Sequence, residues 1–326
     1  MKAIRYHEHG DADVLTVDDV PTPDPGHDEA LVRVHAASVN PIDTYVREGG
    51  VSPAGGLPHV GGSDAAGVVE AVGDGVESVA VGDRVFATGL GLFEDGTYAE
   101  YVAAPAASLA PLPDEVSFTD GAAAAMAFAT AWRGLVNRGG LSVGDTCLIQ
   151  GGAGGVGHAA VQIADHAGAT VVATAGSDRA FVGDLGADGV IDYAGDDVAD
   201  RIREAAGGDI DVVLETHAAA NVTTDLEVLT RGGRIVVLGE EEPITIDPGA
   251  SMTGKIADAD LSFMSIMASR DDQAPILERV GRLLADGTFT VEIEATYPLE
   301  AAAEAQRHVL SDGSRGKVVL TVADAA

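Results

Sequence analysis

The 326-residue sequence predicts an α/β fold with two domains, a doubly wound parallel six-stranded sheet and a β-barrel-type domain. Three observations support this prediction. After about Asp120, continuous apolar strands alternate with helical stretches, as in a parallel sheet covered on both faces. Before that point the strands are short and alternating, with turns between them. A glycine-rich loop at residues 151–157 joins the first apolar strand to a helix.

The first 120 residues predict an all-β, barrel-like unit. Short alternating runs read ALVRVHAASV, AAGVVEAVG, DRVFATG and YAEYVAAP. Turn signals such as Pro-Asp-Pro-Gly and Val-Gly-Asp separate them. Short strands at this spacing are typical of such a unit.

The next part of the chain predicts the parallel sheet. It opens with a helix, GAAAAMAFATAWRGLV, whose N-terminus is marked by Ser117, Thr119 and Asp120. Six apolar strands follow, with helices such as GHAAVQIADHAG and VADRIREAAG between most of them, which suits a complete dinucleotide-binding fold. The expected strands span residues 146–150, 170–175, 189–193, 210–216, 233–239 and 261–268.

The tail after residue 268 is expected to return to the first domain. It reads as a helix, a strand with Tyr297-Pro298, a second helix and a final strand, GKVVLTV. The predicted domains are therefore residues 1–121 with 269–326, and residues 122–268.

Composition limits the class of protein. The net charge of −33 argues against nucleic-acid binding, because phosphates would be repelled. Three lysines stand against sixteen arginines, and acid excess with few lysines predicts adaptation to molar salt; an ordinary acidic protein is the alternative. The single cysteine, Cys147, excludes an intrachain disulfide and a cysteine zinc cluster, and is expected in the core. A cytoplasmic location is expected, because the sequence has neither a secretory leader nor an apolar run of ~18 residues.

The glycine-rich loop carries the most specific signal. Gly152, Gly154 and Gly157 satisfy G-x-G-x-x-G directly after a strand and at the start of a helix. The first glycine allows the tight turn, the second lets the backbone approach a pyrophosphate, and the third lets the helix pack closely. With Ala153, Gly155 and Val156 between them, the loop predicts dinucleotide binding at the helix N-terminus.

The end of the second strand of the sheet selects the cofactor. An NAD enzyme usually carries Asp or Glu about 20 residues beyond the glycines, on the ribose 2′-hydroxyl. Here Gly176 stands 19 residues after Gly157, followed by Ser177, Asp178 and Arg179. Without a carboxylate at the strand end, a hydroxyl and a guanidinium can bind a 2′-phosphate, which predicts NADP(H). The alternative is that Asp178 turns inward and accepts from the ribose.

Six segments together resemble a known family. VNPIDTYVREG, GGSDAAGVVEAVGDGV, GDRVFATG, GTYAEYV, GGAGGVG and RGGRIVVLG, in this order, resemble the zinc-free quinone oxidoreductase (zeta-crystallin-like) branch of the medium-chain dehydrogenase/reductase superfamily. The resemblance covers essentially the whole chain. It implies a GroES-like catalytic domain and a Rossmann domain, with the nicotinamide in the cleft between them.

The resemblance also implies that no metal takes part. Zinc alcohol dehydrogenases of the superfamily hold their catalytic metal with a cysteine in the VNPID region and with a Gly-His-Glu motif. The matching stretches here read Ser38-Val39-Asn40 and Gly62-Ser63-Asp64. These side chains do not supply the usual ligand set of a catalytic zinc.

Matching the family motif residue by residue implies a catalytic set. Asn40, Asp43 and Tyr45 are expected to line the cleft near the nicotinamide, and Thr130 to approach it from the first Rossmann helix. Tyr45 either donates a hydrogen bond or proton to the acceptor oxygen or serves as a packing aromatic. Asn40, which precedes a proline, could instead cap a turn.

Further cofactor contacts are implied outside the glycine loop. Tyr193 is expected beside the adenosine ribose phosphate, Lys317 near the cofactor, and the backbone of His217 at the nicotinamide ribose. The alternatives are a strand-end aromatic for Tyr193 and a surface ion pair for Lys317. The chain is also a couple of residues shorter than its relatives before Tyr193, where a lysine often grips the 2′-phosphate, and Arg179 is the expected substitute. His158, in the helix after the glycines, is expected to pack or to face solvent.

Together these features predict an NADPH-dependent reductase that transfers hydride to a quinone or a similar activated alkene or carbonyl. A quinone suits a metal-free site, because hydride addition gives a delocalised anion that a few hydrogen bonds can stabilise. The alternatives are an enoyl-thioester reductase on the same scaffold and a non-catalytic NADP(H)-binding regulator. A structural crystallin-like or RNA-binding role fits less well. The apolar strand 261–268 is expected at the sheet edge, where it predicts a homodimer.

Overall fold

The structure is a computed structural model that describes residues 1–195, 197–240, 242–311 and 313–322. It divides into two compact units, unit 1 with Met1–Ala129 and Ser269–Ala326, and unit 2 with Thr130–Ala268. The boundary between the two units lies near the C-terminal end of helix α2 (Phe118–Trp132). The sequence predicted this boundary several residues earlier, after residue 121. Within the described residues, no helix is long and apolar enough to cross a membrane.

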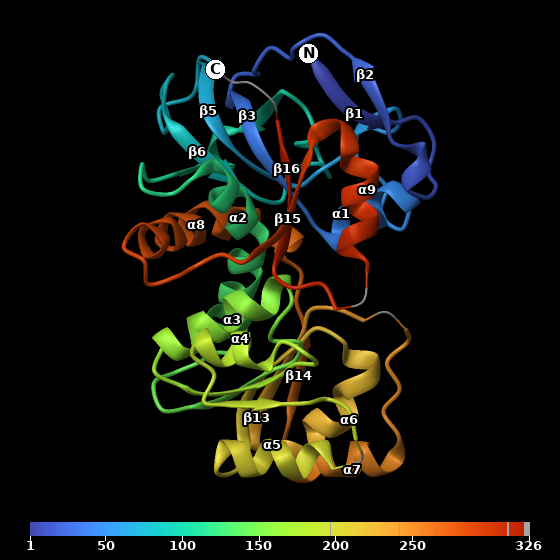
Figure 1. Ribbon diagram of the computed structural model, residues 1–326, viewed down its shortest axis with the longest axis vertical. Coiled ribbons are helices and arrows are strands. Elements are labelled where there is room, and N and C mark those ends of the chain that lie inside the picture. Colours follow the sequence, from blue (N-terminus) through green and yellow to red (C-terminus); the bar gives the residue numbers. More distant parts are fainter. Residues whose placement is uncertain (196, 241, 312, 323–326) are drawn as a thin grey trace. The chain divides into compact units, whose positions relative to one another are not determined.

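Unit 1 is built on two β-sheets (Figure 1). In the described residues, the larger sheet has the order β15-β16-β3-β5-β6-β8, with β7 paired to β3, and the smaller has the order β2-β1-β4. The tail of the chain completes the larger sheet, because β16 pairs antiparallel with β3. The strands are β1 (Lys2–Tyr6), β2 (Thr16–Asp19), β3 (Glu29–Val39), β4 (His59–Val60), β5 (Asp64–Val72), β6 (Arg84–Ala87), β7 (Tyr101–Pro105), β8 (Ala110–Pro111), β15 (Ile293–Pro298) and β16 (Lys317–Thr321).

Unit 1 also contains a helix that the strand pattern did not predict. Helix α1 (Pro41–Glu48) lies in a stretch expected to be all β, and Asn40 is its N-cap residue. Pro41 supplies a φ suited to the first helical position, and the Asp43 carboxylate accepts from the Asn40 N–H at 2.9 Å. Gly49 ends the helix in the left-handed region, with φ 87°. Unit 1 also includes most of α2, together with the helices α8 (Arg270–Ala285) and α9 (Ala302–Val309).

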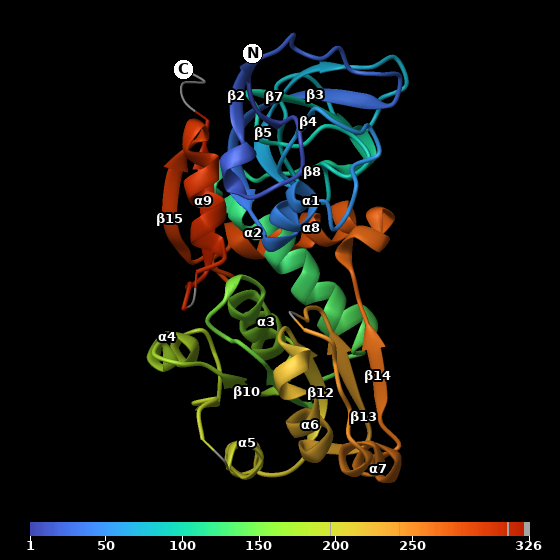
Figure 2. The ribbon, with the colours of Figure 1, turned by 90° about the vertical axis from the view of Figure 1, so that its right-hand side faces the viewer.

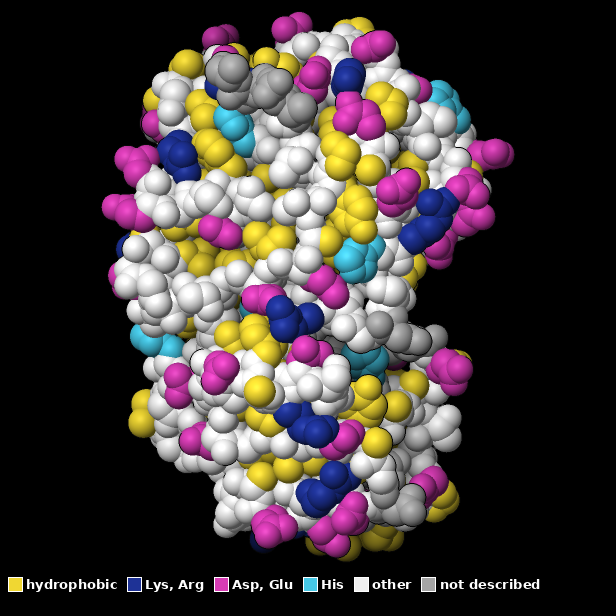
Figure 3. All heavy atoms as spheres, viewed as in Figure 1, with side chains coloured by type: hydrophobic (Ala, Val, Ile, Leu, Met, Phe, Trp, Pro, Cys, Tyr) yellow, Lys and Arg dark blue, Asp and Glu magenta, His cyan; other side chains and the backbone are white. Residues whose placement is uncertain are grey.

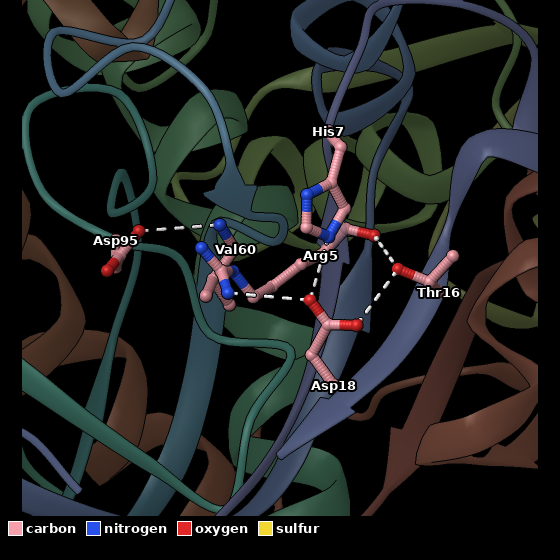
Figure 4. A network of polar contacts seen from close by, with 6 residues as sticks. All are labelled: Arg5, His7, Thr16, Asp18, Val60 and Asp95. Atoms are coloured by element: carbon pink, nitrogen blue, oxygen red, sulfur yellow. Dashed lines mark hydrogen bonds and ion pairs between the residues drawn. The ribbon is translucent and has the colours of Figure 1, made fainter. Parts of the chain in front are cut away.

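An exposed polar network ties the first two strands together (Figure 4). The Asp18 carboxylate on β2 lies 2.8 Å from His7 Nε2 and accepts from Arg5 Nη1 at 3.4 Å and from Thr16 Oγ1 at 3.3 Å. The hydrogen bond from His7 contributes most to lowering the pKa of Asp18. Because these groups face solvent, salt weakens the network.

Unit 2 contains the parallel sheet. In the described residues the strand order is β11-β10-β9-β12-β13-β14, and every neighbouring pair is parallel. This is the order of a doubly wound dinucleotide-binding fold, and the sequence prediction of fold class is confirmed. The strands are β9 (Thr146–Ile149), β10 (Thr170–Thr174), β11 (Gly189–Ile191), β12 (Ile210–Glu215), β13 (Leu229–Val237) and β14 (Asp260–Phe263).

Helices cover both faces of this sheet (Figures 1 and 2). On one face, helix α6 contacts both α5 and α7, and Ile202, Val222 and Ala250 join a core with the strands. Helix α3 lies on the other face. Cys147 of β9 is buried, as expected. The helices are α3 (Gly155–His166), α4 (Arg179–Asp184), α5 (Val198–Ala206), α6 (Ala218–Val228) and α7 (Pro248–Ala257), and a π-helical turn, Arg133–Arg138, follows α2.

The last strand of the sheet is shorter than the apolar run 261–268 predicted. Strand β14 ends at Phe263, and Ile266–Ala268 form a short 3-10 turn. The reason lies in its partner, since β13 ends at Val237, which pairs with Phe263. The apolar residues that follow include Met264 and Ile266, which are buried without being part of the sheet.

Candidate active site

The glycine loop lies at the C-terminal end of β9, beside β12, where the strand order reverses direction. The Gly151 N–H donates to Thr174 Oγ1 at 3.0 Å, and the Gly152 N–H donates to the Thr174 carbonyl at 2.8 Å. Gly154 is the N-cap residue of α3. The loop is therefore fixed to β10 and leads into a helix N-terminus, whose first N–H groups have no partner within the helix.

The three motif glycines serve two different needs. A Cβ at Gly157 would lie 2.0 Å from the Gly151 carbonyl oxygen, and one at Gly152 would lie 2.9 Å from Ala173 Cβ. Packing therefore demands glycine at both positions. At Gly154 the nearest described atom would be the Gly151 oxygen, at 3.5 Å, so the loop backbone is open there. This open backbone at a helix N-terminus fits the pyrophosphate of a dinucleotide.

The end of β10 carries the residues expected at a 2′-phosphate. Gly176 lies against the Tyr193 ring, whose hydroxyl would be 3.0 Å from a Cβ at Gly176. Arg179 donates from Nη1 to the Gly176 carbonyl at 3.0 Å and to Asp192 Oδ2 at 2.7 Å. Ser177 donates to the Asp178 carboxylate at 2.9 Å. The structure brings Gly176, Tyr193 and Arg179 together, and it adds an ion pair with Asp192 that the sequence did not predict.

His217 is the N-cap residue of α6, two residues after the end of β12. Its imidazole lies 3.7 Å from the position of a Cβ at Gly151, and its Nδ1 is 2.9 Å from Thr216 Oγ1. Its backbone N–H donates to the Glu215 carboxylate. The His217 backbone is therefore held beside the glycine loop, and its contact with the nicotinamide ribose stays a prediction.

Two further predicted positions lie on helices α3 and α2. His158 is buried in α3, with Nδ1 3.2 Å from the Gly154 carbonyl oxygen, which agrees with the packing interpretation. Thr130, near the end of α2, is 9% exposed.

Unit 1 contains a buried polar cluster that includes three predicted residues. Asn40 Nδ2 donates to Asp64 Oδ2 at 2.8 Å, and the Lys317 ammonium donates to Asn40 Oδ1 and to the Val39 carbonyl. Lys317 is 5% exposed, so the alternative of a surface ion pair is wrong. Its amine lies inside unit 1, bound to the residue that precedes α1.

The Asp43 carboxylate is the other centre of this cluster. Ser63 Oγ donates to it at 2.5 Å and Tyr98 Oη at 2.7 Å, in addition to the Asn40 N–H. Tyr45, two residues further along α1, is 46% exposed. Asn40, Asp43 and Lys317 thus meet in one cluster, whereas Tyr45 is about half exposed.

Burial dominates the electrostatics of the cluster. It raises the pKa of Asp64 to about 6 and also raises the pKa of Asp43. It lowers the pKa of Lys317, which the two carboxyl groups oppose. The cluster therefore contains one buried ammonium group and two buried carboxyl groups, whose charges interact. In the part of the chain that the structure describes, no group of three or more His, Cys, Asp or Glu is placed to hold a metal ion.

Several buried polar residues escaped the sequence prediction. Tyr98 in unit 1 and Gln150, Glu215 and Asp225 in unit 2 are at most 2% exposed. Their only sequence signal is a polar residue within or directly after an apolar run, as in IDVVLE for Glu215.

Unit 2 has a doubly wound sheet with a glycine loop, and unit 1 is built on two β-sheets. This combination is typical of a dinucleotide-dependent dehydrogenase or reductase. Family matches agree, since residues 26–114 match the alcohol dehydrogenase GroES-like domain and residues 185–320 match a family described as zinc-binding dehydrogenase.

Individual relatives narrow the assignment. Quinone oxidoreductase of Mus musculus is 36% identical over 98% of this chain and 97% of its own length. The quinone oxidoreductase of Coxiella burnetii superimposes with a TM-score of 0.86 at 30% identity, over 99% of each chain. That of Escherichia coli, solved with NADPH, has a TM-score of 0.88 at 27% identity, over 98% of this chain and 100% of its own. The chain belongs to the quinone oxidoreductase (zeta-crystallin-like) branch of the medium-chain dehydrogenase/reductase superfamily, a family of oxidoreductases.

Proposed function

We propose that this oxidoreductase uses NADPH to reduce a quinone, or a similarly activated alkene or carbonyl, by direct hydride transfer without a metal. The observation that carries the proposal is the end of β10 beside the glycine loop, where Gly176 occupies the place of the carboxylate that binds an NAD ribose. The Escherichia coli relative, which was solved with NADPH, supports the same cofactor.

The residues of unit 2 have defined tasks in this proposal. When bound, NADPH supplies the hydride. The loop Gly152–Gly157, including Ala153, Gly155 and Val156, holds the pyrophosphate at the N-terminus of α3. Ser177, Arg179 and the Tyr193 hydroxyl hold the 2′-phosphate near Gly176. His217 and Thr130 contact the nicotinamide half.

The residues of unit 1 act on the acceptor. Asp64 and Lys317 fix both ends of the Asn40 amide, and Asp43 fixes its backbone. The acceptor oxygen gains negative charge as hydride arrives, and a preorganised hydrogen-bond donor stabilises that charge. Tyr45 is our candidate for this donor, because its side chain is 46% exposed whereas Asp43 is buried.

A substrate panel tests the proposal. NADPH oxidation is measured with benzoquinones, with a crotonyl thioester and without acceptor, before and after treatment with a chelator. We expect rapid turnover of the quinone, much slower turnover of the thioester and no effect of chelation. A faster reaction with the thioester supports the enoyl-thioester reductase instead. Tight NADPH binding without turnover of any acceptor supports a regulator, and zinc-dependent activity refutes the metal-free mechanism.

We also propose that two copies of the chain pair through unit 2. Strand β14 is an edge strand of the described sheet, and Phe263 on it is 59% exposed. Helix α7, directly before β14, exposes Met252 by 55% and Ile256 by 75%. Exposed apolar side chains beside an open strand edge suit a two-fold contact that continues the sheet.

A further inference from the structure

A buried polar network lies directly behind the glycine loop. Thr174 ends β10, Gln150 follows β9 and Glu215 ends β12, and these three strands are neighbours in the parallel sheet. Asp225 joins them from α6. All four residues are at most 2% exposed, so each polar atom needs a partner inside the protein.

The hydrogen bonds of this network run in one direction. The Gly151 N–H donates to Thr174 Oγ1 at 3.0 Å, so the single proton of that hydroxyl is available to Gln150 Oε1, at 2.7 Å. With its oxygen engaged, the Gln150 amide donates from Nε2 to Asp225 Oδ1 at 2.8 Å. A continuous chain therefore links the first residue of the glycine loop to the Asp225 carboxyl group.

The Asp225 carboxyl group lies close enough to Glu215 for the two groups to interact electrostatically. Glu215 Oε1 accepts from the His217 backbone N–H and from Asn221 Nδ2, the latter at 3.4 Å. Asp225 Oδ2 and Glu215 Oε2 are buried and have no N–H or O–H donor among the described residues. Two ionised carboxylates in this position would repel each other strongly, whereas one proton held between them satisfies both oxygens.

Among the residues that the structure describes, no cation is placed to replace that proton. Burial first, and then the charge of Glu215, hold the pKa of Asp225 well above its usual range. On the elements packed against α6, the described cations are exposed or pair with other acids. They are Arg201 of α5, with Asp197; Arg203 of α5, with Asp200 and Asp209; Arg234 of β13, with Asp145; Arg231 of β13, exposed; and Lys255 of α7, exposed. His217, whose backbone N–H donates to Glu215, is exposed, and its Nδ1 lies against Thr216.

We propose that Asp225 and Glu215 share one proton and act as positioning residues for the cofactor. Protonated Asp225 holds the glycine loop through Gln150 and Thr174, and Glu215 accepts from the His217 backbone N–H. One buried pair thereby fixes the positions of the glycine loop and of the His217 backbone. These two segments flank the point where the strand order reverses. The inference rests on the proposed role of the glycine loop in binding NADPH.

Substitutions of Asp225 test whether it positions the glycine loop for NADPH or only contributes to the stability of the fold. Asp225→Asn keeps an oxygen for Gln150 and supplies an N–H to Glu215 without a titrating proton, so NADPH should bind within about twofold of wild type. Asp225→Leu removes both contacts and should raise the Kd for NADPH about tenfold. Thr174→Val cuts the chain between Gln150 and Gly151 without touching either carboxyl group, and it should also weaken binding severalfold. Glu227→Gln, on the exposed side of α6, is the matched control.

Infrared difference spectroscopy tests the shared proton itself. At neutral pH, the spectrum of wild type minus Asp225→Asn should show the carbonyl stretch of a protonated carboxylic acid, and the spectrum of wild type minus Glu227→Gln should not. NADPH binding is followed by titration calorimetry, with circular dichroism as a check on folding.

Three results would overturn the inference. They are a missing carboxylic acid band, a folded Thr174→Val variant that binds NADPH like wild type, and Asp225→Asn binding as weakly as Asp225→Leu. If Asp225→Leu does not fold, Thr174→Val and the infrared band still decide. Failure of wild type to bind NADPH would refute the proposed function instead, and the infrared band would then report on the pair alone.

Discussion

Arg179 shows how a neighbour limits what a charged side chain can contribute. Its guanidinium is 48% exposed and lies 2.7 Å from Asp192, which follows β11. The Ala194 N–H and then Arg179 hold the pKa of Asp192 below its usual value, so this carboxyl group is ionised at neutral pH. In the binding mode proposed above, a 2′-phosphate competes with Asp192 for the same guanidinium, and Asp192 also repels it.

This competition predicts the cofactor preference of two variants. Arg179→Ala should raise the Kd for NADPH about threefold to tenfold and leave NADH nearly unchanged, because an exposed, partly neutralised contact lies at the low end of charge-assisted bonds. Asp192→Asn should shift the preference the other way by a similar factor. When Asp192→Asn is combined with Arg179→Ala, its effect on the preference for NADPH should be smaller, because the two residues interact directly. The ratio of NADPH to NADH affinity, measured at low and at molar salt, is the readout. Equal loss of both cofactors in Arg179→Ala would show that this residue supports the loop rather than the phosphate.

Single residues also show where sequence reasoning stops. The glycine motif is local, so its position and its helix could be predicted from spacing alone. Glu215 and Asp225 lie ten residues apart on a strand and a helix, and each alone resembles an ordinary surface acid. Only the packing of α6 on β12 makes them a pair. Asp192 escaped prediction for the same reason, because its partner Arg179 comes from another element.

At the scale of elements, the alternating strands and helices of unit 2 were predictable because each carries its own periodicity. Errors arose where a partner element sets the length. Strand β14 stops at Phe263 because β13 offers no further residue to pair with. Helix α1 was missed because its signals are those of its ends, Asn40-Pro41 and Gly49, and its eight residues are too few for a clear apolar period.

Because β14 is short, the proposed dimer contact depends on a few exposed apolar side chains on β14 and α7. Phe263→Glu or Ile256→Asp should convert a dimer into a monomer at micromolar concentration, because each places a charge inside an apolar contact. Val143→Asp is the matched control, since Val143 is 85% exposed in the same unit but lies ahead of β9, away from β14 in sequence. Sedimentation velocity in high salt measures the mass. A monomeric wild type, or dimers in all three variants, would rule out this surface.

At the scale of the whole molecule, charge is the dominant property. The chain carries 52 acidic residues against 19 lysines and arginines. In the face shown in Figure 3, acidic side chains are scattered over both units rather than gathered in one patch. Like charges spread over a surface repel one another over about one screening length, which depends on the salt concentration. We propose that the protein is adapted to molar salt, where that length is ~3 Å, compared with ~30 Å at ~0.01 M.

The net charge of −33 therefore predicts a steep dependence of thermal stability on salt. The melting temperature should rise most between about 0.01 M and 0.5 M KCl, because the screening length falls fastest there and relieves repulsion that is greater in the compact state. Above that range an electrostatic effect levels off, whereas salting-out of apolar surface continues to grow with concentration. Circular dichroism melts in KCl, with sucrose of matched osmolality as the uncharged control, separate the two. A melting temperature that is flat in KCl, or that rises equally in sucrose, would mean that the acidic surface does not determine stability and that the salt adaptation is misread.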